Sequence, residues 1–484
     1  MLIISSRYLI FNRIILMTIF GGNRILLVLV TGFFSCTIAF GQVQKVLLLS
    51  KAIKTGLQNF QGIQAKKNYL QSSAELVKNT RTEYLPNVVA SIQQSFGTVN
   101  GQFGPSSAYG INGTTSSGPV SSSQRWSAAF GGVYVLNTNW EIFSFGRLQS
   151  RITYTASQVN KDSADLAQEQ FIQSVKIAGA YLNLLVAQTL MKNANANLQR
   201  AMAIQTVVTA RTKNGLNAGV DSSIANAEVS KAKLLIIDAS NTEQQYSNQL
   251  AQLTNATPEH YSADTFFLRT LPATYNTELS IEQNPQVKFY KSRIDQSNGY
   301  SNLLSKSIMP GINLFGIFQS RGSGFDYNYS VITNNYSKDY FTGIKPTRSN
   351  YVTGVSMVWN IISIAKIRHQ VIAQQFISKG LQNEYDLIST QLKDQLVLAD
   401  QRIANSLLSW HEAPVQYKAA SDAYLQKSVL FKNGLSNIID LQQTLYLLNR
   451  AETDVSVGYI NVWQSLLQKA ATSGDFDLFL KQTR

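Results

Sequence analysis

A four-residue turn, Lys-Asn-Gly-Leu, occurs twice in the sequence, at 213–216 and at 432–435. The two copies lie 219 positions apart, and the same offset relates segments 140–148 and 359–367, each of which begins with tryptophan. Two anchors held in one gapless register indicate an internal duplication. The 484 residues are therefore expected to form one two-fold repeated unit of mixed α/β structure.

Each repeat is predicted to contain a helix, two strands, a long helix, the turn and a returning helix. Hydrophobic periodicity, glycine and proline positions set these bounds. Repeat 1 (42–257) has its strands at 86–97 and 125–143 and its later helices at 146–213 and 217–257. A connector (258–280) leads to repeat 2 (281–470), with strands at 310–321 and 350–363 and helices at 365–432 and 436–470. Residues 471–484 are expected to be a C-terminal tail.

The long helices constrain the architecture most strongly. The segment 146–213 contains no proline and as one helix would extend roughly 100 Å at about 1.5 Å per residue. No compact domain of this size can bury such a rod, so we expect a coiled coil or a tube. Pro414 is expected to kink the second long helix or to break its packing. Glycine in each turn fits a left-handed backbone position.

The predicted strands carry one apolar face. In 126–142 apolar residues alternate with small and polar ones, and Trp126 and Trp140 bracket the apolar side. Tyr351 and Trp359 fall on the apolar side of the last strand. This pattern is typical of membrane β-strands with interfacial aromatic residues, although a soluble hairpin with one buried face gives the same alternation. Four strands cannot close around a lumen in lipid, so a homotrimer with twelve strands is the smallest expected assembly.

Residues 1–41 are predicted to be a signal peptide. Three arginines precede or flank an apolar run at 25–30, and small residues surround a cleavage position after Gly41. Met1 and Met17 are both candidate start residues, and a buried N-terminal helix is the alternative. Cys36, the only cysteine, lies in this segment, where lipidation is a further alternative.

Composition excludes several classes of protein. Hydrophobic residues make up 44% of the chain, which excludes a disordered chain, while a mean hydropathy of −0.08 argues against a multispan helical membrane protein. The net charge of +14 is spread along helical faces without the clustered basic and aromatic residues of a nucleic-acid binder. The three histidines are far apart in sequence, and no zinc, nucleophile-elbow or phosphate-loop motif is present. We expect no enzyme, no cofactor and no metal site.

The duplicated order of helix, Leu-Pro or Met-Pro, strand, loop, strand, long helix and Gly-Leu turn resembles the outer-membrane efflux protein (TolC) family over essentially the whole mature chain. The resemblance implies a trimer with a twelve-stranded barrel in the outer membrane of a Gram-negative bacterium, continued by an α-helical barrel in the periplasm. It implies a passive export duct for small molecules, and as partners a periplasmic adaptor, an inner-membrane transporter and outer-membrane lipid.

By this resemblance, the two turns form periplasmic tips that meet the adaptor, through Asn214, Gly215, Leu216, Asn433, Gly434 and Leu435. Asp440 and its repeat counterpart Asp221 are expected at the channel entrance, although an acid early in a helix is also favoured by the helix dipole. Phe431, Ser436 and Gln443 stand where the family has a tyrosine, an arginine and a second acid. We therefore expect the entrance to lack the family's polar latch.

Three alternatives share parts of the pattern. A type I secretion duct for polypeptides has the same architecture. A periplasmic coiled-coil scaffold with a soluble hairpin domain would explain the helices without a membrane. An enzyme of an unrecognised type is the third.

Overall fold

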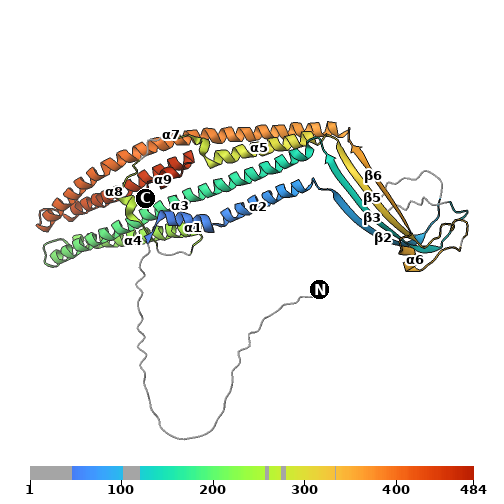
Figure 1. Ribbon diagram of the computed structural model, residues 1–484. Coiled ribbons are helices and arrows are strands. Elements are labelled where there is room, and N and C mark those ends of the chain that lie inside the picture. The colour runs from blue at the N-terminus through green and yellow to red at the C-terminus, as the bar shows by residue number, and fades with distance from the viewer. Residues whose placement is uncertain (1–45, 102–119, 257–260, 274–278, 333, 484) are drawn as a thin grey trace, which may run out of the picture. The chain divides into compact units, whose positions relative to one another are not determined.

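The computed structural model describes residues 46–483 except 102–119, 257–260, 274–278 and 333. The predicted signal segment 1–41, with Cys36, Met1 and Met17, lies outside the described residues. The elements follow the duplicated order that the sequence predicts (Figure 1). In the first repeat they are α1 (Leu49–Asn59), α2 (Gln61–Thr82), β2 (Asn87–Thr98), β3 (Ala128–Phe143), α3 (Arg147–Lys213) and α4 (Gly219–Thr254).

The second repeat contains a similar series, with a 3-10 helix in place of α1 and an additional short helix between its strands. Its elements are η2 (Ile281–Gln283), α5 (Pro285–Lys306), β5 (Gly311–Ser323), α6 (Tyr340–Ile344), β6 (Arg348–Val358), α7 (Ser363–Lys432) and α8 (Ile438–Ser473). The 67 residues of α3 and the 70 residues of α7 each extend roughly 100 Å at about 1.5 Å per residue. Each pairs with the returning helix of its own repeat, α4 or α8 (Figure 1).

The sheet lies at one end of the helices (Figure 1). Its four strands are antiparallel in the order β2-β3-β5-β6. The ladder register places one set of alternate residues on a face that we call the apolar face: Val88, Ile92, Phe96, Phe130, Tyr134, Leu136, Trp140, Leu314, Phe318, Tyr351, Val355 and Met357. The opposite, polar face includes Ser91, Gln93, Asn137, Asn139, Glu141, Asn313, Gln319, Arg321 and Asn350.

Two strand predictions extend too far. Strand β3 begins at Ala128, so Trp126 lies outside it. The segment before Ala128 does not continue the strand pairing, because Arg125 is held elsewhere. The Arg125 backbone N–H donates to the Asn100 side chain, and the Arg125 guanidinium donates to the Tyr329 carbonyl. Strand β6 ends at Val358, before Trp359, since the Asn360 side chain accepts from the Ser363 backbone N–H where α7 begins.

One helix prediction is corrected, and another helix continues through a proline. The N-terminal helix is two helices, because Phe60 has an extended backbone between α1 and α2. Helix α7 runs unbroken through Pro414, and Ala413 beside it is buried. Pro414 therefore does not end the helix: the one backbone bond that proline removes costs about 3 kcal/mol, while the rest of the 70-residue helix keeps its hydrogen bonds.

The connector and the tail are more ordered than predicted. Strand β4 (Ser262–Ala263) pairs in parallel with β1 (Val46–Leu47), and η1 (Thr265–Leu268) follows it. After α8, the helix α9 (Asp477–Leu480) buries Phe479 completely. Phe479 packs edge-to-face on Trp463, whose indole donates to the Thr270 carbonyl. Connector and tail thus complete the main hydrophobic core, which lies midway along the helices.

Candidate functional site

The two Lys-Asn-Gly-Leu turns adopt the same backbone conformation. Gly215 and Gly434 have φ of +70° and +78°, the left-handed region that glycine adopts without a Cβ penalty. The leucine after each glycine donates its backbone N–H to the carbonyl five residues earlier, Arg211 or Leu430, at 2.9 Å in both cases. The left-handed glycine inferred from the sequence is confirmed at both positions.

The turns present their leucines to solvent. The side chains of Leu216 and Leu435 are 68% and 74% exposed, and Asn214 and Asn433 beside them are exposed too. Two largely exposed apolar side chains at equivalent positions are available for another surface.

The two aspartates have different surroundings. Asp440 forms an ion pair with Lys427 at 2.9 Å and accepts a weak bond from the Ser436 hydroxyl at 3.5 Å. The hydrogen bond from Lys427 lowers the pKa of the Asp440 carboxyl and outweighs the opposing effect of desolvation. Asp221 instead accepts from the Asn217 amide at 2.8 Å. The repeat position of Lys427 is Val208, so the first hairpin has no cation there.

Arg211 joins the two hairpins near their tips. From the last turn of α3, its guanidinium donates to the Phe431 and Lys432 carbonyls at 2.9 and 3.2 Å. It also donates to the Asn217 side chain at 2.8 Å and lies 5.7 Å from the centre of the Phe431 ring. Since a cation at a helix C-terminus is favoured by the helix dipole, Arg211 stabilises the end of α7 as well as the contact.

Phe431 is a core residue of the tip. It is 3% exposed and packs with Val208, Ala225, Ile438 and Leu441. Gln443, by contrast, is exposed. Of the five residues expected at the entrance, the structure brings together Asp440 and Ser436 and places Phe431 inside the tip. Gln443 follows Asp440 on the same helix, α8, and Asp221 lies on α4 of the other hairpin.

Sequence reasoning missed Arg211 and Lys427. Lys427 lies seven residues before Gly434 and Asp440 six residues after it, so an antiparallel hairpin brings them face to face. This near-equal spacing on either side of the turn could have predicted the ion pair. Arg211 acts across repeats, and no spacing along the chain indicates such a contact.

The four aromatic residues expected at the membrane interfaces fall at two levels of the sheet. Trp140 donates its indole N–H to the Tyr84 carbonyl at 2.7 Å, and Trp359 donates to the Ile308 carbonyl at 3.0 Å. Both carbonyls lie two residues before the proline of each repeat, so the duplication repeats this contact where strands meet helices. Trp126 and Tyr351, 82% and 79% exposed, lie toward the opposite end of the strands.

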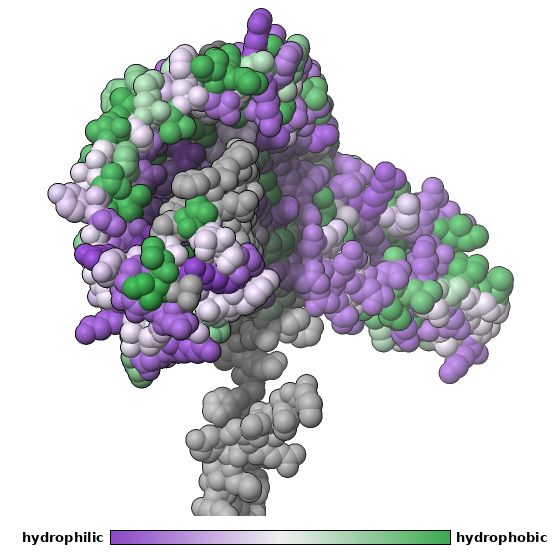
Figure 2. Space-filling view, turned by 90° about the vertical axis from the view of Figure 1, so that its right-hand side faces the viewer, coloured by the Kyte–Doolittle hydropathy of each residue, from purple (hydrophilic) through white to green (hydrophobic). Residues whose placement is uncertain are grey.

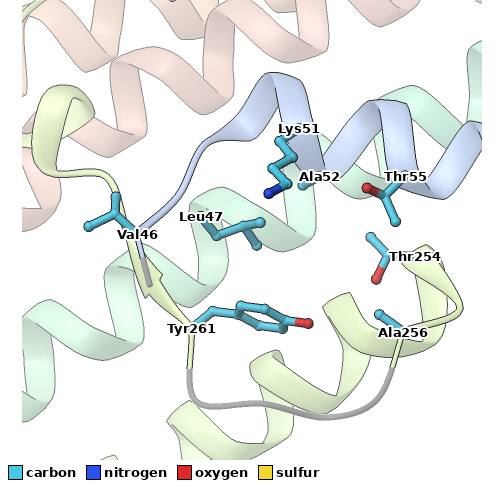
Figure 3. A pocket seen from close by; sticks show the side chains of 8 residues that line it. All are labelled: Val46, Leu47, Lys51, Ala52, Thr55, Thr254, Ala256 and Tyr261. Atoms are coloured by element: carbon cyan, nitrogen blue, oxygen red, sulfur yellow. The ribbon is translucent and has the colours of Figure 1, made fainter. Parts of the chain in front are cut away.

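A separate pocket of about 200 Å³ lies between the start of α1, the end of α4 and Tyr261 (Figure 3). Its lining combines Leu47, Ala52 and Ala256 with Lys51 and two threonines. Over the described residues, no cluster of three or more histidine, cysteine or acidic side chains could hold a metal ion. No helix in the described ranges is both long and apolar enough to span a membrane.

Residues 52–256 match the family described as outer membrane efflux protein. The predicted family resemblance is confirmed. The description of that family names the outer membrane and efflux, the location and role that the resemblance implies. Comparison with curated proteins found no matching sequence.

Solved outer-membrane channels share the fold. CmeC of Campylobacter jejuni is 14% identical, with 88% of this chain and 85% of CmeC covered and a TM-score of 0.71. MtrE of Neisseria gonorrhoeae, solved in its open state, is 17% identical, with 88% of each chain covered and a TM-score of 0.67. VceC of Vibrio cholerae is 13% identical, with coverage of 88% and 96% and a TM-score of 0.69. The chain thus shares the TolC-like fold of these channels over nearly its whole described length.

Proposed function

We propose that this protein is the outer-membrane channel of a tripartite efflux system, a passive duct for small molecules in a Gram-negative bacterium. One observation carries the proposal beyond the family match. The four-stranded sheet has a continuous apolar face, and its outer strands β2 and β6 have no ladder partner on their free sides in the described part of the chain.

Such a sheet requires further copies of itself in a membrane. Unpaired backbone N–H and C=O groups each cost several kcal/mol in hydrocarbon, so membrane strands form closed barrels. Pairing β6 of one copy with β2 of the next closes the ring, and three copies give twelve strands. The apolar face then meets lipid, and the helices continue into the periplasm. Trp140 and Trp359 mark the periplasmic level of the membrane, and Trp126 and Tyr351 the outer level.

The helical tips are the proposed docking site for a periplasmic adaptor. Exposed Leu216 and Leu435, held by the left-handed glycines before them, offer matching apolar contacts from both hairpins. The adaptor would connect the channel to an inner-membrane transporter, which supplies the energy for export.

The entrance is proposed to lie beside these tips. Asp440 supplies one carboxylate per copy to a ring of three. Ser436 and Gln443 lie around the start of α8 beside it, and Asp221 lies in the first turn of α4 in the other hairpin. Phe431 contributes indirectly, because it fills the core on which the second turn rests.

Cell fractionation tests the proposal. The protein is expected in the outer-membrane fraction, resistant to washing with high salt or alkaline carbonate and released only by detergent, and native mass spectrometry of the released protein should give three copies. Release by salt or carbonate as a monomer would contradict the proposal and favour the soluble scaffold.

A further inference from the structure

The short helix α6 covers one end of the sheet on its apolar face. The Tyr340 ring packs edge-to-face on Phe130 with ring centres 5.2 Å apart, and its hydroxyl donates to the Gln94 side chain at 2.6 Å. The Tyr134 hydroxyl donates to the Ile344 carbonyl at 3.0 Å. Gln94, Phe130 and Tyr134 lie on the apolar face according to the ladder register, so α6 packs on that face of the sheet.

Glycines on both surfaces make this contact close. A Cβ added to Gly132 on β3 would lie 2.9 Å from the Ile344 carbonyl oxygen, and one added to Gly343 on α6 would lie 2.5 Å from the Phe130 Cβ. Gly322 on β5 faces the Lys345 carbonyl in the same way. Any side chain at these positions would push α6 away, so the backbone of α6 rests directly on the strands.

The outer surface of α6 combines an aromatic side chain with basic residues on each side. Phe341 is 74% exposed, and Lys338 and Lys345 flank the helix and are exposed. The intervening acid, Asp339, is engaged within the helix, because its carboxylate accepts from both the backbone N–H and the hydroxyl of Thr342 at 2.8 Å. The two lysines are free of that acid.

The level of α6 follows from the strand directions. It packs where β2 ends and β3 begins, at the end of the sheet away from the helices (Figure 1). Viewed from that end, hydrophobic residues gather along the outer edge of the curved near part (Figure 2). With the helices in the periplasm, this end lies at the cell surface.

We propose that α6 is an anchor for the outer leaflet of the membrane, with Phe341 at the boundary of the hydrocarbon and Lys338 and Lys345 at phosphate-bearing lipid headgroups. The inference rests on the proposed outer-membrane function. Aromatic side chains favour this boundary, lysine extends its charged end toward the headgroups, and anionic headgroups attract basic residues. Lipid is the occupant because α6 continues the apolar face that the proposed barrel turns toward lipid.

Spin labelling can locate Phe341. Cys36 is the only cysteine in the sequence, so Cys36→Ser provides a background for Phe341→Cys, Ile92→Cys and Gln93→Cys, each carrying a nitroxide. Ile92 and Gln93 are neighbours on opposite faces of β2 and serve as matched lipid and lumen controls. The protein is reconstituted in vesicles of phosphatidylethanolamine and phosphatidylglycerol, and collision with oxygen is compared with collision with a water-soluble nickel complex.

The label at 341 should resemble that at 92, with oxygen collisions favoured at least twofold relative to the label at 93. If the label at 92 is exposed to lipid while the label at 341 collides with the nickel complex, or with neither reagent, the anchor proposal is contradicted and the channel proposal is not. If the label at 92 itself collides with the nickel complex, the proposal that the sheet lies in the membrane is contradicted.

Bound lipid tests the lysines. The double variant Lys338→Gln/Lys345→Gln should retain at least twofold less phosphatidylglycerol per protomer after purification from these vesicles than the control Lys393→Gln/Lys418→Gln, which changes exposed lysines of α7. Equal retention by the two variants would overturn the headgroup assignment.

Discussion

At the scale of single residues, the duplication repeats backbone geometry but not charge. Both turns have a left-handed glycine and an exposed leucine. Only the second hairpin pairs its aspartate with a lysine, because Val208 occupies the first-repeat position of Lys427. Each repeat would therefore contribute differently to the proposed entrance.

Asp440 should stay ionised to lower pH than an ordinary aspartate. Its pKa is lowered from 3.8, mainly by the hydrogen bond from Lys427, so the ion pair is complete above pH 3.8 and is lost as pH falls through the lower folded value. Block of the reconstituted channel by a trivalent cation should therefore persist at pH 4. The block should be weak in Asp440→Asn. In Lys427→Met, the pH at which half of the block is lost should rise toward 3.8. A wild-type midpoint above 3.8 would contradict this account.

Leu435→Glu should abolish dye efflux from cells while the trimer remains intact by native mass spectrometry. The charge would enter an apolar docking surface without disturbing the fold, since the side chain is 74% exposed. Gly434 is a poorer test, because its φ of +78° adds backbone strain to any substitution. Leu435→Met is the control and should export normally. Undiminished efflux by Leu435→Glu would count against docking at this turn.

At the scale of elements, cross-repeat contacts hold the hairpins together. Helices α3 and α8 are joined by Arg200, which binds both carboxylate oxygens of Glu452 at 2.6 and 2.9 Å. Arg211 makes the corresponding link near the tips. The sequence predicts that the entrance lacks the family's polar latch, because Phe431, Ser436 and Gln443 replace its polar residues. Arg211 of the first repeat nevertheless forms a polar link to the second hairpin within the same chain.

Arg211→Ala should loosen the tips. It removes three hydrogen bonds at the ends of α3 and α7, worth about 1–2 kcal/mol together after solvent exchange. Hydrogen exchange of backbone amides in 428–440 should accelerate roughly 5- to 30-fold. Lys213→Ala, an exposed change in the same turn, should leave exchange unchanged. Equal exchange in both variants would show that Arg211 does not hold the tips.

Tyr181→Phe should loosen the connector. The fully buried Tyr181 hydroxyl donates to the Leu47 carbonyl and accepts from the Asp264 backbone N–H, and burial raises the pKa of Tyr181 to about 12. Leaving both partners unsatisfied costs about 1–3 kcal/mol. Limited proteolysis near 261–264 should therefore be faster in this variant. Tyr69→Phe, at a 62% exposed site, should match the wild type, and equal rates in all three proteins would contradict the role of Tyr181.

The elements show where sequence reasoning succeeds. Periodicity, the prolines and the repeated turn predict the long helices and four main strands, because each is set by local pattern. Helix α6 and the β1–β4 pair were missed, since five-residue and two-residue elements have no period to detect. They form because glycines allow α6 to approach the sheet and Tyr181 holds β1 beside β4. Arg211 was missed because its partners in the other hairpin, Phe431 and Lys432, are more than 200 positions away.

At the scale of the whole molecule, one chain alone leaves backbone groups unpaired and apolar side chains exposed. The sheet has two unpaired edges in the described residues, and α7 exposes Phe376, Leu387, Val397 and Leu408 to solvent. A ring of three copies would satisfy both, because each sheet edge and each helix then meets a neighbour. The channel is thus proposed to exist only as an assembly.

The most direct test of the central claim is single-channel recording of the detergent-released protein in a planar lipid bilayer. The account predicts discrete conductance steps from the trimer, with the conductance or its block by multivalent cations altered in Asp440→Asn. Protein that inserts but gives no discrete steps, or that fails to enter the bilayer, would contradict the claim that this chain forms an outer-membrane channel.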